Sequence, residues 1–127
     1  MVAIGNIKEE YKEIYKNTYN VYNIILESIK PNMKYEELYK IFTEAIKKSK
    51  YKEYYLESVA HGRGIQTIEG NIIRPGVKKT IMPNEIYSIG VSIAVPGVGG
   101  ARLEDAVLIK HGSVEILTNS VRNLLNI

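Results

Sequence analysis

The first 48 residues carry apolar side chains at the spacing of α-helices. From residue 6 to residue 29, isoleucine, valine and tyrosine recur every three or four positions, which predicts one long helix. Asn6 followed by Glu9 has the spacing of a capping box, and Pro31 disfavours helical conformation in the residue before it. A second helix is predicted over residues 35–48, where leucine, isoleucine, phenylalanine and alanine form one apolar face.

The region from about residue 56 to residue 118 has the pattern of β-strands. Two runs rich in isoleucine and valine, residues 86–95 and 101–109, flank a Pro-Gly-Val-Gly-Gly turn, so we expect them to pair as long strands. The second run contains three charged residues within four positions, which a buried strand tolerates only if they pair or bind a ligand. A short strand is predicted over 114–117 and a short helix over 121–125.

Length and composition fit one domain of the α+β class. The chain has 127 residues, 45% of them hydrophobic and 24% charged, which is typical of a single globular domain spanning residues 1–127. It has no cysteine, which excludes disulfides and thiolate metal ligands. No apolar run approaches the roughly 18 residues of a membrane helix, and no signal peptide is visible, so we expect a cytoplasmic protein without membrane contact.

The net charge of +3 is mild but unevenly distributed. Most lysines and nine of the ten tyrosines lie in the first 55 residues, a composition that could bind nucleic acid through phosphate contacts and base stacking. Glutamates are interleaved with these lysines and interrupt any continuous basic stripe. We therefore favour two amphipathic helices with solvated faces, and we rank nucleic-acid binding last among the functions considered below.

The last third of the chain resembles a known enzyme family. After Val-Pro-Gly at 95–97 comes Arg-Leu-Glu-Asp-Ala-Val-Leu-Ile at 102–109, and then Glu-Ile-Leu-Thr at 115–118. This order is similar to the C-terminal signature of the pita-bread metallopeptidases, which include methionine aminopeptidases, Xaa-Pro dipeptidases and creatinase. The resemblance implies the C-terminal half of a pita-bread catalytic domain, in which two N-terminal helices pack on a curved antiparallel sheet.

The resemblance also implies a set of metal-ligand positions, of which this chain keeps two. Enzymes of the family hold two divalent ions with two aspartates, one histidine and two glutamates. His61, in His-Gly-Arg-Gly, matches the ligand histidine, and Glu104 matches the last glutamate. Gly90 stands in place of the other ligand glutamate, and Ile68 in place of a substrate-site histidine. The two aspartates precede the part of the domain to which this chain corresponds.

Two of five ligands do not make a two-metal centre, so we expect no resident cofactor. If a metal binds, we expect one weakly held Mn, Co or Zn ion, because catalytic zinc sites ordinarily use three protein ligands. Glu104 is then expected to form an ion pair with Arg102 or with Arg63, and Arg63 could neutralise Glu104 where a metal once did. His61 is expected to be a loop residue hydrogen-bonded to backbone.

Three functions remain open at this point. The first is a catalytically inactive, peptidase-like binding or scaffold module with a peptide as a conceivable ligand. The second is half of a split aminopeptidase or prolidase completed by another chain, although such a partner would not restore Gly90 or Ile68. Nucleic-acid binding is the third. A half-domain exposes a sheet edge, so we expect a homodimer or a complementary N-terminal half chain.

Overall fold

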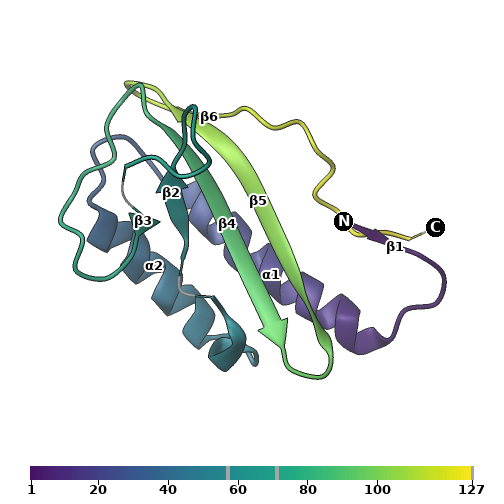
Figure 1. Cartoon of the computed structure of the whole chain (residues 1–127). Helices are drawn as coiled ribbons and strands as arrows, with labels where there is room; N and C mark the ends of the chain where they lie inside the picture. Colours follow the sequence, from purple (N-terminus) through teal and green to yellow (C-terminus); the bar gives the residue numbers. More distant parts are fainter. Residues whose placement is uncertain (57, 71, 127) are drawn as a thin grey trace.

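The computed structural model describes residues 1–56, 58–70 and 72–126 and places two helices on one face of an antiparallel sheet (Figure 1). The spatial order of the five strands is β3 (Ile72–Ile73), β2 (Ala60–Gly62), β4 (Ile86–Val95), β5 (Gly99–Ile109) and β6 (Val114–Ile116). A 3₁₀ turn, η1 (Lys52–Tyr54), precedes β2. This confirms the predicted α+β architecture. Among the described residues, every helix is too short or too polar to cross a membrane.

The two helices cover the sheet with their apolar sides. Helix α1 (Glu9–Ser28) buries Ile14, Val21 and Ile25, and helix α2 (Tyr35–Lys47) buries Leu38 and Phe42. Successive positions in these sets are four or seven residues apart, so they fall on one side of each helix. The periodicity of the sequence therefore predicted both helices, with an error of three residues at the start of the first.

The β4–β5 hairpin forms the centre of the sheet and separates two chemically different faces. Tyr87, Ile89 and Val91 of β4 are at most 1% exposed and pack in the core under the helices. Ser88 and Gly90, between them in sequence, point to the opposite face because side chains alternate along a strand. Strand β5 pairs with β4 along its whole length, so it extends the same two faces.

Half of the ten tyrosines are buried in the core. Tyr15, Tyr22, Tyr35, Tyr51 and Tyr87 are all buried. The hydroxyls of Tyr35 and Tyr87 lie 2.8 Å apart and form a hydrogen bond between α2 and β4. These side chains therefore connect the helices to the sheet.

The predicted capping box at the start of α1 is wrong. The helix begins at Glu9, and its N-cap residue Lys8 forms no side-chain capping hydrogen bond. The carboxylate of Glu9 accepts a hydrogen bond from Lys12 at 3.1 Å, so it does not cap the backbone of Asn6. Glu9 and Glu10 still favour the helix start through their negative charge.

The predicted C-terminal helix over residues 121–125 is also wrong. The chain is extended there and ends in β7 (Leu125–Asn126), which pairs in parallel with β1 (Val2–Ala3). A five-residue helix has too few hydrogen bonds to form without strong packing. Here the side chain of Arg122 bonds to Asp105 of β5 instead, which holds the segment against the body of the protein.

Candidate functional site

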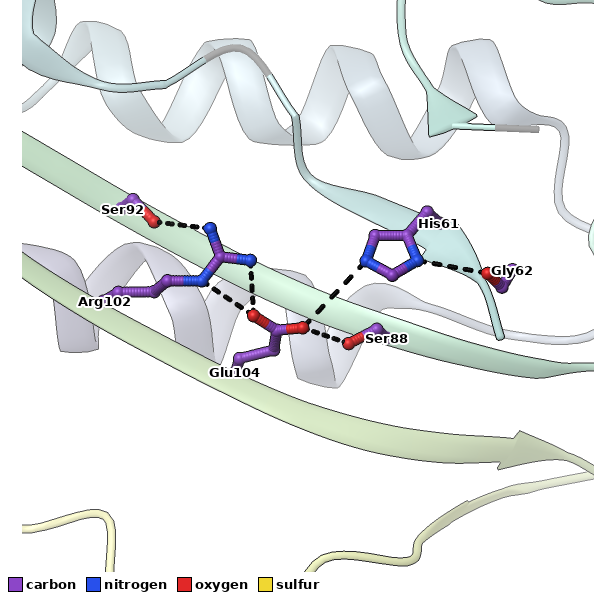
Figure 2. Close-up of polar contacts among 6 residues, drawn as sticks. All are labelled: His61, Gly62, Ser88, Ser92, Arg102 and Glu104. Atoms are coloured by element: carbon purple, nitrogen blue, oxygen red, sulfur yellow. Dashed lines mark hydrogen bonds and ion pairs between the residues drawn. The ribbon is translucent and has the colours of Figure 1, made fainter. Parts of the chain in front are cut away.

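A cluster of polar side chains lies on the face of the sheet that the helices leave uncovered (Figure 2). His61 of β2 is paired in register with Ser88 of β4, and Gly90 of β4 is paired with Glu104 of β5. Directly paired residues of antiparallel strands point to the same face. The sheet therefore brings together His61 and Glu104, which are 43 positions apart in the sequence.

Arg102 forms an ion pair with Glu104 from two positions earlier on the same strand. Its Nε atom donates to Oε2 of Glu104 at 2.7 Å, and its Nη2 atom contacts the same oxygen. The Nη1 atom lies 3.4 Å from the hydroxyl of Ser92, which is paired in register with Arg102. The Ser88 hydroxyl donates to the other carboxylate oxygen, Oε1. Both oxygens of Glu104 therefore have donors from the protein.

His61 is held by its own backbone neighbour. Its Nδ1 atom lies 3.1 Å from the carbonyl oxygen of Gly62, so Nδ1 carries the proton and donates it. The Nε2 atom points toward Glu104 and lies 4.0 Å from Oε1 (Figure 2). The His61 side chain is only 12% exposed, so the strand fixes the ring beside the carboxylate.

The surroundings of Glu104 favour its charged form. Burial raises the pKa of this carboxyl, but hydrogen bonds from Ser88 and Arg102 and the charge of Arg102 outweigh burial. The pKa of Glu104 is therefore lower than that of an ordinary glutamate. At neutral pH the centre of the cluster is a carboxylate that a guanidinium already neutralises.

Gly90 leaves space that the guanidinium of Arg102 partly occupies. A Cβ atom built on Gly90 would lie 3.4 Å from Nη2 of Arg102 and 3.5 Å from Cγ and Oε2 of Glu104. These are ordinary van der Waals distances, so a methyl group fits without displacement. A longer side chain directed the same way would meet the guanidinium. The position where the family resemblance implies a glutamate ligand thus faces an arginine.

Arg63 and Ile68, the other two residues singled out from the sequence, lie in the loop after β2. Arg63 is exposed, and its backbone nitrogen donates to the carbonyl of Ile86 at 2.9 Å. Within the described part of the chain, no ion pair joins Arg63 to Glu104, and Arg102 takes that role. Ile68 is 49% exposed and adds an apolar surface where the resemblance implies a histidine.

Glu69 shapes this loop, a role that the sequence analysis missed. Its backbone nitrogen donates to the carbonyl of Gly62 at 2.9 Å, and its Oε1 atom accepts from the backbone nitrogen of Gln66 at 2.7 Å. A Cβ on Gly62 would overlap the backbone oxygen of Glu69, and one on Gly64 would overlap its carboxylate. Gly62 is therefore required by the close approach of the Glu69 backbone, whereas a side chain at Gly64 would only have to displace the flexible carboxylate of Glu69.

Ser88 and Ser92 are further members of the cluster that sequence reasoning did not identify. Both are less than 10% exposed, and both bond to the Arg102–Glu104 pair. Their signal in the sequence is the period of two along β4, where Ser88, Gly90 and Ser92 interrupt an otherwise apolar strand. Small polar residues at alternate positions of a buried strand indicate a polar network on one face.

The side chains present do not fit the two-metal centre that the resemblance implies. Among the described residues, no three histidine, cysteine, aspartate or glutamate side chains gather as metal ligands. One imidazole and one carboxylate remain at His61 and Glu104, and a guanidinium contacts the carboxylate. These side chains therefore form a hydrogen-bonded ion-pair cluster around Glu104 and do not form the ligand set of two metal ions.

Comparisons with known proteins agree on one family. The sequence model of metallopeptidase family M24 matches residues 1–111. The Xaa-Pro dipeptidase of Pyrococcus furiosus is 32% identical over 124 residues, which are 98% of this chain and 36% of that protein. This chain therefore spans about a third of the length of such relatives.

Solved structures of pita-bread enzymes share the fold closely. An X-Pro aminopeptidase from Thermotoga maritima superimposes with a TM-score of 0.91 at 26% identity, over 99% of this chain and 36% of that one. The prolidase from Pyrococcus horikoshii gives 0.90 at 29% identity, over 98% and 36%. The expected C-terminal half of a pita-bread fold is confirmed, and the chain belongs to metallopeptidase family M24.

Proposed function

We propose that this chain is an M24 peptidase-like domain that does not hydrolyse peptides and acts as a binding or scaffold module, a pseudoenzyme of its family. One observation carries the proposal: Arg102 is paired with Glu104 directly across from Gly90. The one glutamate retained at a ligand position is neutralised by an internal cation. The other glutamate position has no side chain.

A divalent ion at Glu104 would have to compete with groups that the protein already supplies. Arg102 contacts Oε2 through two nitrogens, and the Ser88 hydroxyl donates to Oε1. His61 is the remaining ligand-type side chain, and within the described ranges no third one joins it. Two protein ligands give at most a weakly bound Mn, Co or Zn ion. The hydroxide needed for metal-assisted hydrolysis would not be generated there.

Half of a split aminopeptidase or prolidase is the second candidate. It is supported by the retained geometry of His61 and Glu104 on an uncovered face, and by a match to only about a third of each relative. A partner carrying the two aspartates would raise the ligand count to four. It would restore neither the carboxylate missing at Gly90 nor the histidine missing at Ile68. We therefore rank it second.

The uncovered face is where we place the partner of this domain. A second copy of this chain or a complementary N-terminal half chain would cover the β4–β5 face and the free strand edges. A peptide is the small ligand that we expect on the same face. We place the protein in the cytoplasm.

The test is a hydrolysis assay with Xaa-Pro dipeptides in the presence of Mn²⁺ or Co²⁺, with the Pyrococcus furiosus dipeptidase as the positive control. We expect no turnover from this chain, and none from the Arg102→Met variant, because removing the guanidinium does not supply the missing carboxylate. Hydrolysis that scales with chain and metal concentration, and that Glu104→Gln abolishes, would overturn the proposal. Dipeptide binding without turnover, detected as NMR shifts around His61 and Glu104, would support it.

A further inference from the structure

The last ten described residues form an extended strap on the edge of the protein. This strap, residues 117–126, leaves β6, runs beside α1 and ends against β1 near the N-terminus (Figure 1). Backbone hydrogen bonds fix its two ends. The nitrogen of Leu117 donates to the carbonyl of Ala106 at 2.8 Å, and that of Leu125 donates to the carbonyl of Met1 at 3.1 Å.

One buried carboxylate holds the middle of the strap. Asp105 of β5 is 3% exposed and lies on the helix side of the sheet, on the opposite face from Glu104. Its Oδ2 atom accepts from Nε of Arg122 at 2.8 Å and from the Tyr22 hydroxyl, and its Oδ1 atom accepts from the Thr118 hydroxyl. Two of these three donors belong to the strap, and the third belongs to α1. We call these four side chains the latch.

Few apolar contacts hold the strap in place apart from the latch. Val121 is 61% exposed and Leu125 is 44% exposed, so neither is buried against the core. Leu124 is partly buried, and the Tyr15 hydroxyl donates to the carbonyl of Arg122. A segment with so little buried apolar surface depends on its polar contacts to stay closed.

A small apolar cavity of about 150 Å³ lies under the strap. Leu124 of the strap lines it together with Ala101 of β5, Ile14 and Tyr11 of α1, and Val2 of β1. These residues come from four separate segments, and the strap contributes Leu124 to a pocket whose other walls include the exposed side chains of Val2 and Tyr11. Opening the strap would remove Leu124 from the cavity wall and admit solvent to Ala101, which is now 7% exposed.

We propose that the strap is a cover that opens as a unit, and that the latch at Asp105 controls its opening. When the latch is broken, residues 117–126 separate from α1 and β5, Leu124 leaves the wall of the pocket, and Ala101 becomes accessible to solvent. The helices and the central strands stay folded when the strap opens. Their buried core of isoleucine, valine and aromatic side chains contains no strap residue, and Leu124 only packs against it.

The absence of native cysteine allows a direct test by thiol labelling. Ala101→Cys places the single thiol of the chain in the cavity under the strap. Ala60→Cys, in a second protein, places it at a site in β2 that is 1% exposed and distant from the strap along the sheet order. The rate of reaction with a soluble thiol reagent under native conditions then measures how often each site opens.

Two latch variants are combined with each reporter. Thr118→Val removes one hydroxyl donor with little change in shape, and Asp105→Asn removes the charge. Glu115→Gln is the matched control, since it makes the same carboxylate-to-amide change in an exposed ion pair with Lys110. We expect labelling of the Ala101→Cys thiol to rise about ten- to a hundredfold in the latch variants, as hydrogen bonds to a charged group are lost.

We expect Glu115→Gln to leave both labelling rates unchanged. In the wild type and in the latch variants, we expect the Ala101→Cys thiol to react at least about tenfold faster than the Ala60→Cys thiol, because opening of the strap exposes only the first site. Equal labelling rates at the two reporters would mean that both sites open only when the whole domain unfolds, and would overturn the proposal. An unchanged Ala101→Cys rate in Thr118→Val would overturn it too, and this milder variant decides the matter if Asp105→Asn does not fold.

Discussion

The buried carboxylate of Asp105 gives the sharpest prediction for stability. Asp105→Asn keeps the shape of the side chain but removes its charge and turns one acceptor oxygen into a donor NH₂ group. That group would lack an acceptor if it faced Arg122, and if it faced the Thr118 hydroxyl it would force that hydroxyl to accept instead of donate, while the ion pair with Arg122 is lost in either case. Hydrogen bonds to charged groups contribute about 1.5–3 kcal/mol each, and breaking one partner of a buried pair costs about 3–5 kcal/mol.

We expect Asp105→Asn to lower the free energy of unfolding by about 2–4 kcal/mol, which is less than the sum of the three hydrogen-bond energies. The Arg122 side chain is 28% exposed, so water can replace part of its ion pair. For a domain of this size the loss lowers Tm by roughly 10 °C. Urea titration followed by circular dichroism measures it, with Glu115→Gln as the control expected to change the free energy by less than about 0.5 kcal/mol.

The pH dependence of the same variant provides the second half of the test. Burial raises the pKa of Asp105, but hydrogen bonds from Arg122, Thr118 and Tyr22 outweigh it and lower the pKa in the folded state. The stabilisation is therefore complete above the unfolded aspartate pKa of about 3.9, and is lost as the pH falls through the lower folded-state value. The gap between wild type and Asp105→Asn should close in acid. A gap that is constant from pH 7 to pH 2, or below about 0.5 kcal/mol at pH 7, would refute this reasoning.

Three further substitutions test the site and the core. Gly90→Ala should change the free energy of unfolding by less than about 1 kcal/mol in urea titrations, because the added Cβ makes only ordinary van der Waals contacts. A larger loss would mean that the space beside Gly90 is tighter than described. Gly62→Ala should cost about 1–3 kcal/mol in the same titrations and shift the NMR signals of residues 62–69, because the new methyl group overlaps the backbone oxygen of Glu69. Unchanged signals would contradict the loop geometry. Phe42→Ala should cost about 3–5 kcal/mol by thermal unfolding, since Phe42 is 1% exposed, and a loss near 1 kcal/mol would place it outside the core.

The central hairpin could be predicted from the sequence because one local pattern determines it. The apolar runs around Pro96 and Gly97 fixed the position of both strands, and β4 has the predicted bounds. The helix periods likewise predicted α1 and α2, since their apolar spacing matches the face that packs on the sheet. The family resemblance singled out His61 and Glu104 as ligand positions, and the structure brings them within 4.0 Å of each other from β2 and β5, on either side of β4.

What the sequence did not reveal depends on contacts between distant residues. The C-terminal segment has a plausible helix pattern, but Asp105 draws Thr118 and Arg122 into an extended strap. Whether Arg63 or Arg102 would pair with Glu104 could not be decided from spacing alone. The structure shows that Arg102 is the partner. Arg102 and Glu104 lie two positions apart on β5, so both side chains are on the same face of the sheet.

The close packing of Glu69 on the loop glycines is a further contact between residues that spacing alone does not connect. Gly62 and Gly64 are part of a short motif, so the sequence pointed to their positions but not to the reason for them. A glutamate several residues later fills the space that a side chain on either glycine would need. Close backbone approaches of this kind become visible only in three dimensions.

The most direct test of the central claim is a calorimetric titration of the purified chain with Mn²⁺ or Co²⁺ near neutral pH. The arrangement of Arg102, Glu104 and Gly90 predicts no saturable heat beyond dilution at micromolar metal, and the same result for Glu104→Gln. Two tight sites per chain, lost in Glu104→Gln, would contradict the account and restore this domain to the metal-dependent hydrolases.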